Sequence, residues 1–227
     1  MKRTNLESPA LRPSELPYRE FHYPRRAANY LSVPSPLSRA TLFDVLESRQ
    51  TCRSFEGPLD EPALSTILWY SSKTRTTRRE ASGFVWQHRP SPSGGGRHPL
   101  DLLVWQSDTV GPCLYDPIAH SLVELNANTP SAGEELIAHT RHIVPFKTAS
   151  LIWFAAQFDR TLSRYQHGES VVWRDAGVLT AAICLIAEAL GLSCCPLGIT
   201  GEPFISRLLG SKSLVVGAGG LLIGRRF

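Results

Sequence analysis

Hydrophobic positions along the chain follow two different periods, and this predicts that helices alternate with strands. Residues 149–157 (ASLIWFAAQ) are apolar almost without interruption over the length of one strand, a pattern typical of a strand that is covered on both faces. Residues 175–190 are apolar nearly all round a helix, from Asp175 to the position before Gly191. A helix that is apolar on all sides lies either in a protein core or in a membrane. We expect a protein core, because about 16 residues are too few for a membrane span.

Shorter patterns predict the remaining elements. The sequence DEP at 60–62 is typical of a helix start, because acidic groups suit the first turn and proline loses no hydrogen bond there; Leu64, Ile67 and Leu68 then fall on one face. Further helices are expected over 42–49, 132–141 and 202–209, and strands over 102–106, 114–116, 122–125 and 214–223, the middle two forming a hairpin. This alternation predicts a mixed fold, α/β or α+β.

Two regions lack such patterns. Residues 1–40 are rich in proline and have little periodicity, which predicts an extended arm, so we divide the chain into this arm and one folded domain over 41–227. Residues 71–89 are polar and rich in arginine and lead into PSPSGGG at 90–96, which no helix or central strand tolerates. We expect a loop or linker there.

Composition narrows the class of protein. The chain has 227 residues and a net charge of +4 without a long basic block, so we expect no nucleic-acid partner. Five cysteines without a C-x-x-C motif favour neither disulfides nor zinc. The residues after Met1 also lack an apolar run, so we expect a cytoplasmic protein that is not bound to a membrane.

Candidate chemistry lies in arginines and glycine-rich loops, because the common hydrolase, nucleotide-binding and zinc-protease motifs are missing. Arg49 and Arg53 are four residues apart and could hold one anion if the preceding helix continues; a solvated helix end is the alternative. Adjacent Cys194 and Cys195 fit buried packing better than redox chemistry. His139 and His142 lack further ligands, so no metal is expected.

In chain order, several motifs resemble the nitroreductase family of flavin enzymes, and within it the SagB-type branch that includes azoline dehydrogenases of thiazole and oxazole peptide biosynthesis. The resemblance starts at R-x-T-x-R-x-F (49–55) and continues through P-S-x-G (92–95), LYDPIAHSLVEL (114–125) and R-Y (164–165). Two glycines separated by 13 residues, Gly177 and Gly191, with Leu192 after them, complete it.

This resemblance implies an α+β fold, namely an α/β/α sandwich around a mixed, mainly antiparallel sheet, in a homodimer that binds FMN between its subunits. By position, Arg49, Gln50 and Thr51 match contacts to the ribityl phosphate, and Arg53 matches the cation beside the N1 edge of the flavin. The other implied FMN contacts are Pro92, Ser93, Gly94, Gly95 and Arg97 in a loop usually supplied by the partner subunit, Pro196, Leu197 and Gly198 over the ring, and Arg225 or Arg226 at the phosphate.

The same resemblance implies a catalytic pair, Arg164 and Tyr165, where azoline dehydrogenases have Lys-Tyr. Arginine holds its proton too tightly to be a base but could lower the pKa of Tyr165, which would then accept a proton; a surface role for Tyr165 is the alternative. We therefore expect an FMN-dependent oxidoreductase that transfers a hydride between flavin N5 and a small or peptide-borne substrate, with azoline-to-azole oxidation in natural-product biosynthesis as the favoured reaction. The alternatives are an NAD(P)H-dependent nitro or quinone reductase and a non-catalytic flavin-binding scaffold in a biosynthetic complex.

Overall fold

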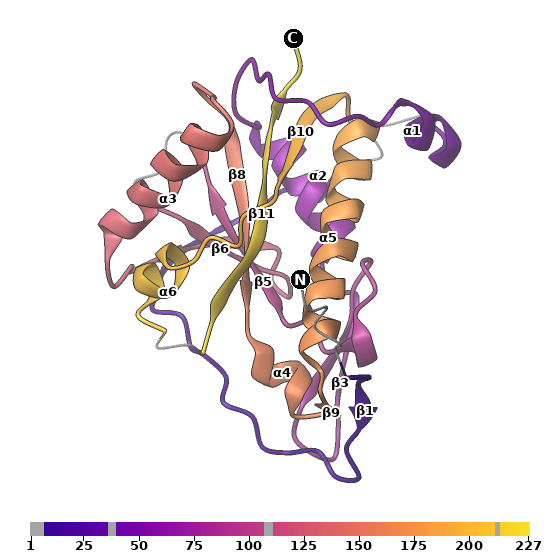
Figure 1. Cartoon of the computed structure of the whole chain (residues 1–227). Coiled ribbons are helices and arrows are strands. Elements are labelled where there is room, and N and C mark those ends of the chain that lie inside the picture. Colours follow the sequence, from indigo (N-terminus) through magenta and orange to yellow (C-terminus); the bar gives the residue numbers. More distant parts are fainter. Residues whose placement is uncertain (1–6, 36–39, 107–110, 212–213) are drawn as a thin grey trace, which may run out of the picture.

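A seven-stranded sheet forms the centre of the protein in a computed structural model, which describes residues 7–35, 40–106, 111–211 and 214–227 (Figure 1). Neighbouring strands pair antiparallel throughout, so the described sheet is antiparallel rather than mixed. Its order is β10 (Leu192–Leu197), β11 (Val216–Arg225), β8 (Ser150–Ala156), β5 (Leu100–Trp105), β6 (Cys113–Asp116), β7 (Ser121–Leu125) and β2 (Arg25–Tyr30).

The apolar run predicted as a doubly covered strand is β8, and its alternation divides the core into two layers. Ile152 and Phe154 join the cluster that contains α2 (Glu61–Ser72) and α5 (Glu169–Ala189). Leu151 and Trp153 join the cluster that contains α3 (Pro130–Ile143) and α6 (Phe204–Leu209). The helices therefore cover both faces of the sheet, and the predicted α/β/α sandwich is confirmed (Figure 1).

The glycines of β11 make room for the fully buried Trp153. A Cβ atom at Gly220 would lie 2.6 Å from this indole ring and 2.7 Å from the Ile152 carbonyl oxygen. The Trp153 Nε1–H donates to the Thr200 carbonyl at 2.8 Å, so the buried ring keeps its hydrogen bond. The glycine-rich sequence of this strand is therefore explained by close packing.

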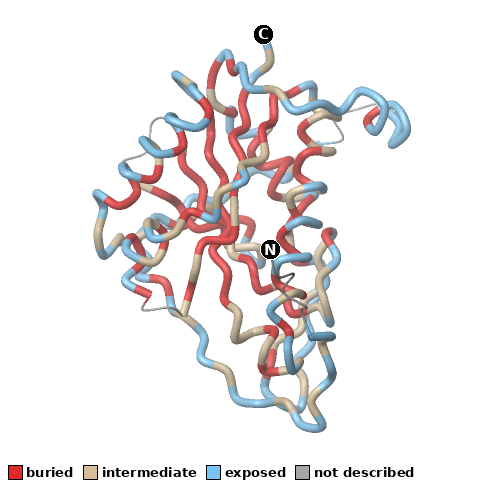
Figure 2. The backbone as a smooth tube through the Cα atoms, in the orientation of Figure 1, coloured by how far each residue is buried: buried red, intermediate tan, exposed pale blue. Residues whose placement is uncertain are grey.

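The helix start predicted at residues 60–62 is confirmed. Asp60 is the N-cap of α2, and its Oδ1 accepts from the Ala63 N–H at 2.9 Å. The helix expected from residue 42 is α1 (Leu42–Ser48), which starts with a capping box between Thr41 and Asp44. This helix projects from the body, and its side chains are mostly exposed (Figures 1 and 2).

The prediction for α5 is wrong about its start and length. The helix begins at Glu169, six residues before Asp175, and its 21 residues have the length and hydropathy of a possible membrane span. A single such helix is weak grounds for a membrane protein, because core helices pass the same test. The buried face of α5, with Val172, Ile183 and Ala187 fully covered, packs in the core cluster with α2 and the sheet (Figure 2).

Two polar regions form more structure than predicted. The expected loop over 71–89 contains a hairpin, β3 (Thr76–Arg79) with β4 (Val85–His88), so that prediction is wrong. The N-terminal segment is extended as expected but provides two strands: β1 (Ala10–Leu11) pairs with β9 (Tyr165–Gln166), and β2 is the edge of the main sheet. The short helices α4 (Phe158–Leu162) and η1 (Gly94–Gly96) lie in the connections.

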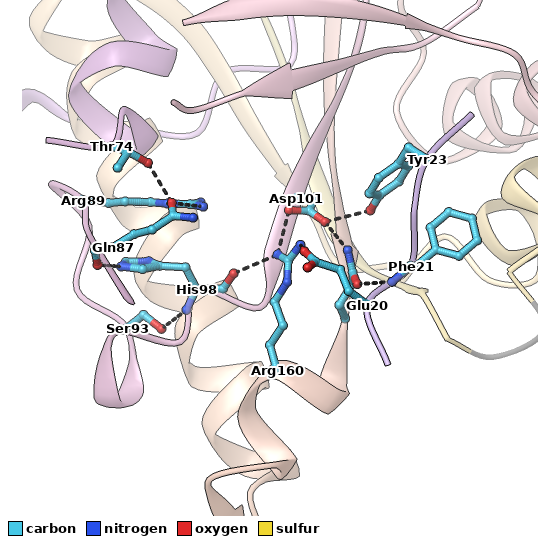
Figure 3. Close-up of polar contacts among 11 residues, drawn as sticks. Glu20, Phe21, Tyr23, Thr74, Gln87, Arg89, Ser93, His98, Asp101 and Arg160 are labelled. Atoms are coloured by element: carbon cyan, nitrogen blue, oxygen red, sulfur yellow. Dashed lines mark hydrogen bonds and ion pairs between the residues drawn. The ribbon is translucent and has the colours of Figure 1, made fainter. Parts of the chain in front are cut away.

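A buried polar network ties the N-terminal segment to the sheet (Figure 3). Asp101 on β5 accepts from Arg160 at 2.8 Å through Oδ1, and from the Tyr23 hydroxyl at 2.9 Å and Gln157 Nε2 at 2.7 Å through Oδ2. Gln157 in turn accepts from the Phe21 N–H at 2.8 Å. Burial favours protonation of Asp101, but the Arg160 charge and these hydrogen bonds outweigh it and lower the pKa of the carboxyl group.

The substitution Asp101→Ala should lower the free energy of unfolding by about 3 to 5 kcal/mol. It removes one of the carboxylates that pair with the buried Arg160 charge, and it leaves the Tyr23 hydroxyl and the Gln157 amide without their acceptor. Urea unfolding followed by fluorescence measures this. The matched control is Glu135→Gln, which breaks the exposed Glu135–Arg207 pair and should change stability little. Equal effects of the two substitutions would contradict the importance of the network.

Candidate active site

The first part of the candidate site is the segment after α1, which lies against the edge strand β10. The Cys52 N–H donates to the Cys194 carbonyl at 3.0 Å and fixes this segment to the strand. Arg49, Gln50, Thr51 and Arg53 around it are all exposed. Neither Arg49 nor Arg53 forms an ion pair with any residue that the structure describes, so both guanidinium groups are available to a ligand.

The last residues of β10 and of β11 add further candidates, at opposite ends of this antiparallel strand pair. Pro196 and Leu197 are partly buried, and exposed Gly198 has open space where a side chain would be. Arg225 is exposed and, among the described residues, has no acidic partner. We call the three free cations Arg49, Arg53 and Arg225 the arginine edge.

Arg226 has a different role from Arg225, although sequence reasoning treated the two as equivalent. Its Nη2 donates to Glu188 at 2.8 Å and to the Leu192 carbonyl at 3.0 Å. The hydrogen bond from Arg226 lowers the pKa of Glu188, which lies near the end of α5. Arg226 therefore joins α5 to β10, which leaves Arg225 as the freer candidate for an anionic ligand.

The second part of the site is the glycine-rich loop, which α5 holds through Asp175. The Ser93 hydroxyl donates to Asp175 Oδ2 at 2.6 Å, and the Gly94 N–H donates to Oδ1 at 3.1 Å. Burial raises the pKa of Asp175, while these two hydrogen bonds act in the opposite direction. Sequence reasoning took Asp175 as a helix start; as an acid inside an apolar helix it could have been identified as an anchor.

Glycines let this loop pack tightly on its neighbours. A Cβ atom at Gly94 would collide with Val171 on α5, and one at Gly95 would lie 2.5 Å from the Tyr165 hydroxyl. Gly95 also has φ of +61°, which favours glycine. The structure thus brings Tyr165 and the loop of the same chain together.

Tyr165 and the loop line an open groove of about 450 Å³. Pro92, Ser93 and Gly94 form one side of it, and α5 residues including Asp175 form another. Among the described residues, the Arg164 side chain has no hydrogen bond or ion pair, so its action on Tyr165 stays a prediction.

Arg97, predicted as a cofactor contact, is buried with 2% exposure, and its guanidinium group already has partners within the protein. It pairs with Glu15 and with Glu80 at 3.5 Å, donates to the Arg160 carbonyl at 2.7 Å, and lies over the Phe84 ring. These contacts join the N-terminal segment to the β3–β4 hairpin. The geometry therefore gives Arg97 a structural role rather than a place at a ligand.

The two parts of the site lie at opposite ends of α5 (Figure 1). Asp175 holds the loop near one end, and Glu188 holds Arg226 near the other. Thirteen residues separate these anchors, which is about 20 Å at the rise of an α-helix. Within one chain, the loop and the arginine edge therefore lie beside different ends of this helix.

A sequence model of the Nitroreductase family matches residues 46–224. The chain belongs to the nitroreductase family. The resemblance read from its motifs is thus confirmed, while a comparison with curated proteins gives no match.

Solved structures of nitroreductases share the fold. A protein described as a nitroreductase from Ralstonia eutropha JMP134 is 21% identical, with a TM-score of 0.66 over 93% of this chain and 99% of that one. One from Desulfovibrio desulfuricans in complex with FMN is 19% identical, with a TM-score of 0.52 over 83% and 87%. The E. coli microcin synthetase McbBCD complex, with truncated pro-MccB17 bound, contains a chain that is 14% identical, with a TM-score of 0.60 over 85% and 75%.

The substitution Asp175→Ala should free the loop without unfolding the protein. Loss of hydrogen bonds to a carboxylate costs about 1.5 to 3 kcal/mol locally, so amide exchange at residues 93–98 should become roughly 10 to 100 times faster. Hydrogen exchange with mass spectrometry measures this. Arg174→Ala, an exposed neighbour on α5, is the control, and unchanged protection in the Asp175 variant would show that Asp175 does not hold the loop.

Proposed function

We propose that the protein is an FMN-dependent oxidoreductase whose site forms between two copies of the chain. The arginine edge of one copy binds the anionic cofactor, and the Pro92–Gly95 loop of the other copy covers its ring. The carrying observation is that the loop and the arginine edge lie beside opposite ends of α5, whose anchors Asp175 and Glu188 are about 20 Å apart, in a chain of the nitroreductase family. Two similar structures, from Desulfovibrio desulfuricans and Desulfitobacterium hafniense, contain FMN.

The residues present fit this cofactor. Arginines without acidic partners suit a phosphate, and Arg49, with Gln50 and Thr51 beside it, would hold the phosphate and ribityl chain. Arg225 adds a second cation for the phosphate. The open space at Gly198, next to Pro196 and Leu197, leaves room for a flat ring at the end of β10.

Exposed apolar surface supports the homodimer. Leu42, Phe43 and Leu46 on the projecting α1 are 61%, 75% and 53% exposed, and Trp173 on α5 is 45% exposed. Such side chains, one group beside each part of the site, are what a second copy would bury. A dimer would also bring the loop of one chain to the arginine edge of the other.

In this site, bound FMN supplies the chemistry of hydride transfer, and the protein supplies charge, orientation and proton transfer. Arg53 stabilises negative charge at the N1 edge of the ring. Tyr165, beside the loop and in the groove, accepts the proton that an azoline substrate loses when it becomes aromatic. Arg164, next to Tyr165 in the chain, completes the proposed catalytic pair.

The substrate class we favour is a peptide-borne azoline, which makes the protein a SagB-type dehydrogenase, able to act in a biosynthetic complex. Support comes from the Arg164-Tyr165 pair beside the groove and from the similarity to a chain of the microcin synthetase complex. The five cysteines, all free thiols, agree with the cytoplasm as its location. NAD(P)H-dependent reduction of nitro compounds or quinones is the second candidate, favoured by the nitroreductases among the similar structures.

The purified protein should be yellow and should release FMN, identified by mass, at one per chain. Anaerobic mixing with an azoline peptide should bleach the flavin absorption, and Tyr165→Phe should slow that step by about 10²- to 10⁴-fold with unchanged FMN content.

Different outcomes separate the alternatives. Steady oxidation of NAD(P)H by a quinone, with no bleaching by azolines, would identify a reductase instead. Bound FMN that no donor reduces would indicate a non-catalytic scaffold, and a colourless protein that takes up no added FMN would contradict the proposed function as a whole.

A further inference from the structure

A second cavity, of about 560 Å³, lies next to the C-terminal end of the glycine-rich loop, whereas the groove lies next to its beginning. Its walls come from the N-terminal segment around residues 18–25, the β3–β4 hairpin, and β5 with β6. Its volume is that of a typical small-molecule site. Gly96, Arg97 and His98 line this cavity, whereas Pro92, Ser93 and Gly94 line the groove, so one segment of chain separates the two.

Each acidic residue that lines the cavity forms an ion pair with an arginine. Asp101 and Glu20 each pair with Arg160 at 2.8 Å, and Asp116 pairs with Arg25 at 3.4 Å. The lining cation Arg97 has its own pairs with Glu15 and Glu80 outside the lining. One lining arginine, Arg89, has no acidic partner among the residues that the structure describes.

Arg89 is held in place by a neutral side chain (Figure 3). Its Nε and Nη2 donate to Gln87 Oε1 at 3.0 and 2.8 Å, and the Thr74 hydroxyl donates to the same oxygen at 2.7 Å. Desolvation by the surrounding protein lowers the pKa of Arg89 to about 10, so the group is still charged at neutral pH. A fixed, poorly solvated guanidinium that keeps N–H donors free is suited to a carboxylate, which it can bind through two hydrogen bonds.

The remaining walls are suited to a flat apolar body. Tyr18, Phe21, Phe84 and Tyr115 contribute rings to the lining. Burial lowers the pKa of His98 to about 3, so this imidazole adds no second positive charge. The combination is one unpaired cation among aromatic rings.

We propose that this cavity is a second ligand site, distinct from the flavin site, which binds a small aromatic carboxylate through Arg89. The carboxylate lies against the free edge of the guanidinium, and the ring of the ligand packs among the aromatic walls. Neither the arginine edge nor Tyr165 takes part.

Isothermal titration of the full chain, as purified, with benzoate tests the proposal. Benzoate should bind the unsubstituted protein, while benzyl alcohol, which has the same ring without the charge, and inorganic phosphate, which has charge without a ring, should bind at least tenfold more weakly. Arg89→Gln should weaken benzoate binding at least tenfold and leave FMN content unchanged. Arg89→Lys should weaken it less, because the charge stays but the planar fork is lost.

The matched control is Arg79→Gln, an exposed arginine of the hairpin that directly precedes Arg89, which should bind benzoate like the unsubstituted protein. If Arg89→Gln does not fold, the comparison of benzoate with benzyl alcohol on the unsubstituted protein decides, and equal affinities overturn the proposal. No benzoate binding at millimolar concentration, unchanged binding in Arg89→Gln, or tighter binding of phosphate than of benzoate also overturns it.

Discussion

The burial of α5 against the sheet is the constraint on which the arrangement of the site depends. One face of this helix lies in the core with α2, β5, β8 and β11, so its position along the sheet is fixed. The helix then carries Asp175 toward one end and Glu188 toward the other. Asp175 holds the glycine-rich loop, and Glu188 holds Arg226, the chain neighbour of Arg225 in the arginine edge. The spacing of the two half-sites is therefore set by packing.

Pairing decides what each arginine can do. Arg97, Arg160 and Arg226 are committed to carboxylates and to backbone carbonyls, and they join segments that are far apart in the sequence. Arg49, Arg53 and Arg225 lie exposed along one sheet edge without acidic partners among the described residues, which leaves their charge for a ligand. Arg89 also has no acidic partner among the described residues, but it lines a cavity and donates to the amide oxygen of Gln87.

Sequence patterns predicted the elements whose apolar residues face a core. The β8 run and the α2 start were found because burial imposes a period and a cap on them. The hairpin from Thr76 to His88 and the edge strand β2 were missed because they are mostly exposed, so their sequences carry no hydrophobic alternation. The start of α5 was missed because its first turns contain charged residues such as Glu169 and Arg174.

For the site, motifs identified the segment at 49–53 and the glycine-rich loop. They could not distinguish arginines that are paired within the protein from arginines that are available to a ligand. Arg97 follows the loop directly, yet its guanidinium turns to Glu15, which lies 82 residues earlier in the chain. Arg225 and Arg226 are adjacent and have opposite roles. Local sequence does not contain these long-range partners, and the Asp175 and Asp101 contacts were missed for the same reason.

Complementation between two defective chains tests the shared site most directly. Arg53→Glu should disable the arginine edge, and Pro92→Trp should block the loop with a bulky ring at an exposed position, so each variant alone should be purified without FMN. A mixed dimer, isolated through a different tag on each chain, has one site with two intact halves and should hold one FMN per dimer. A mixed dimer without FMN would contradict the account, because it would mean that both halves of a site come from the same chain.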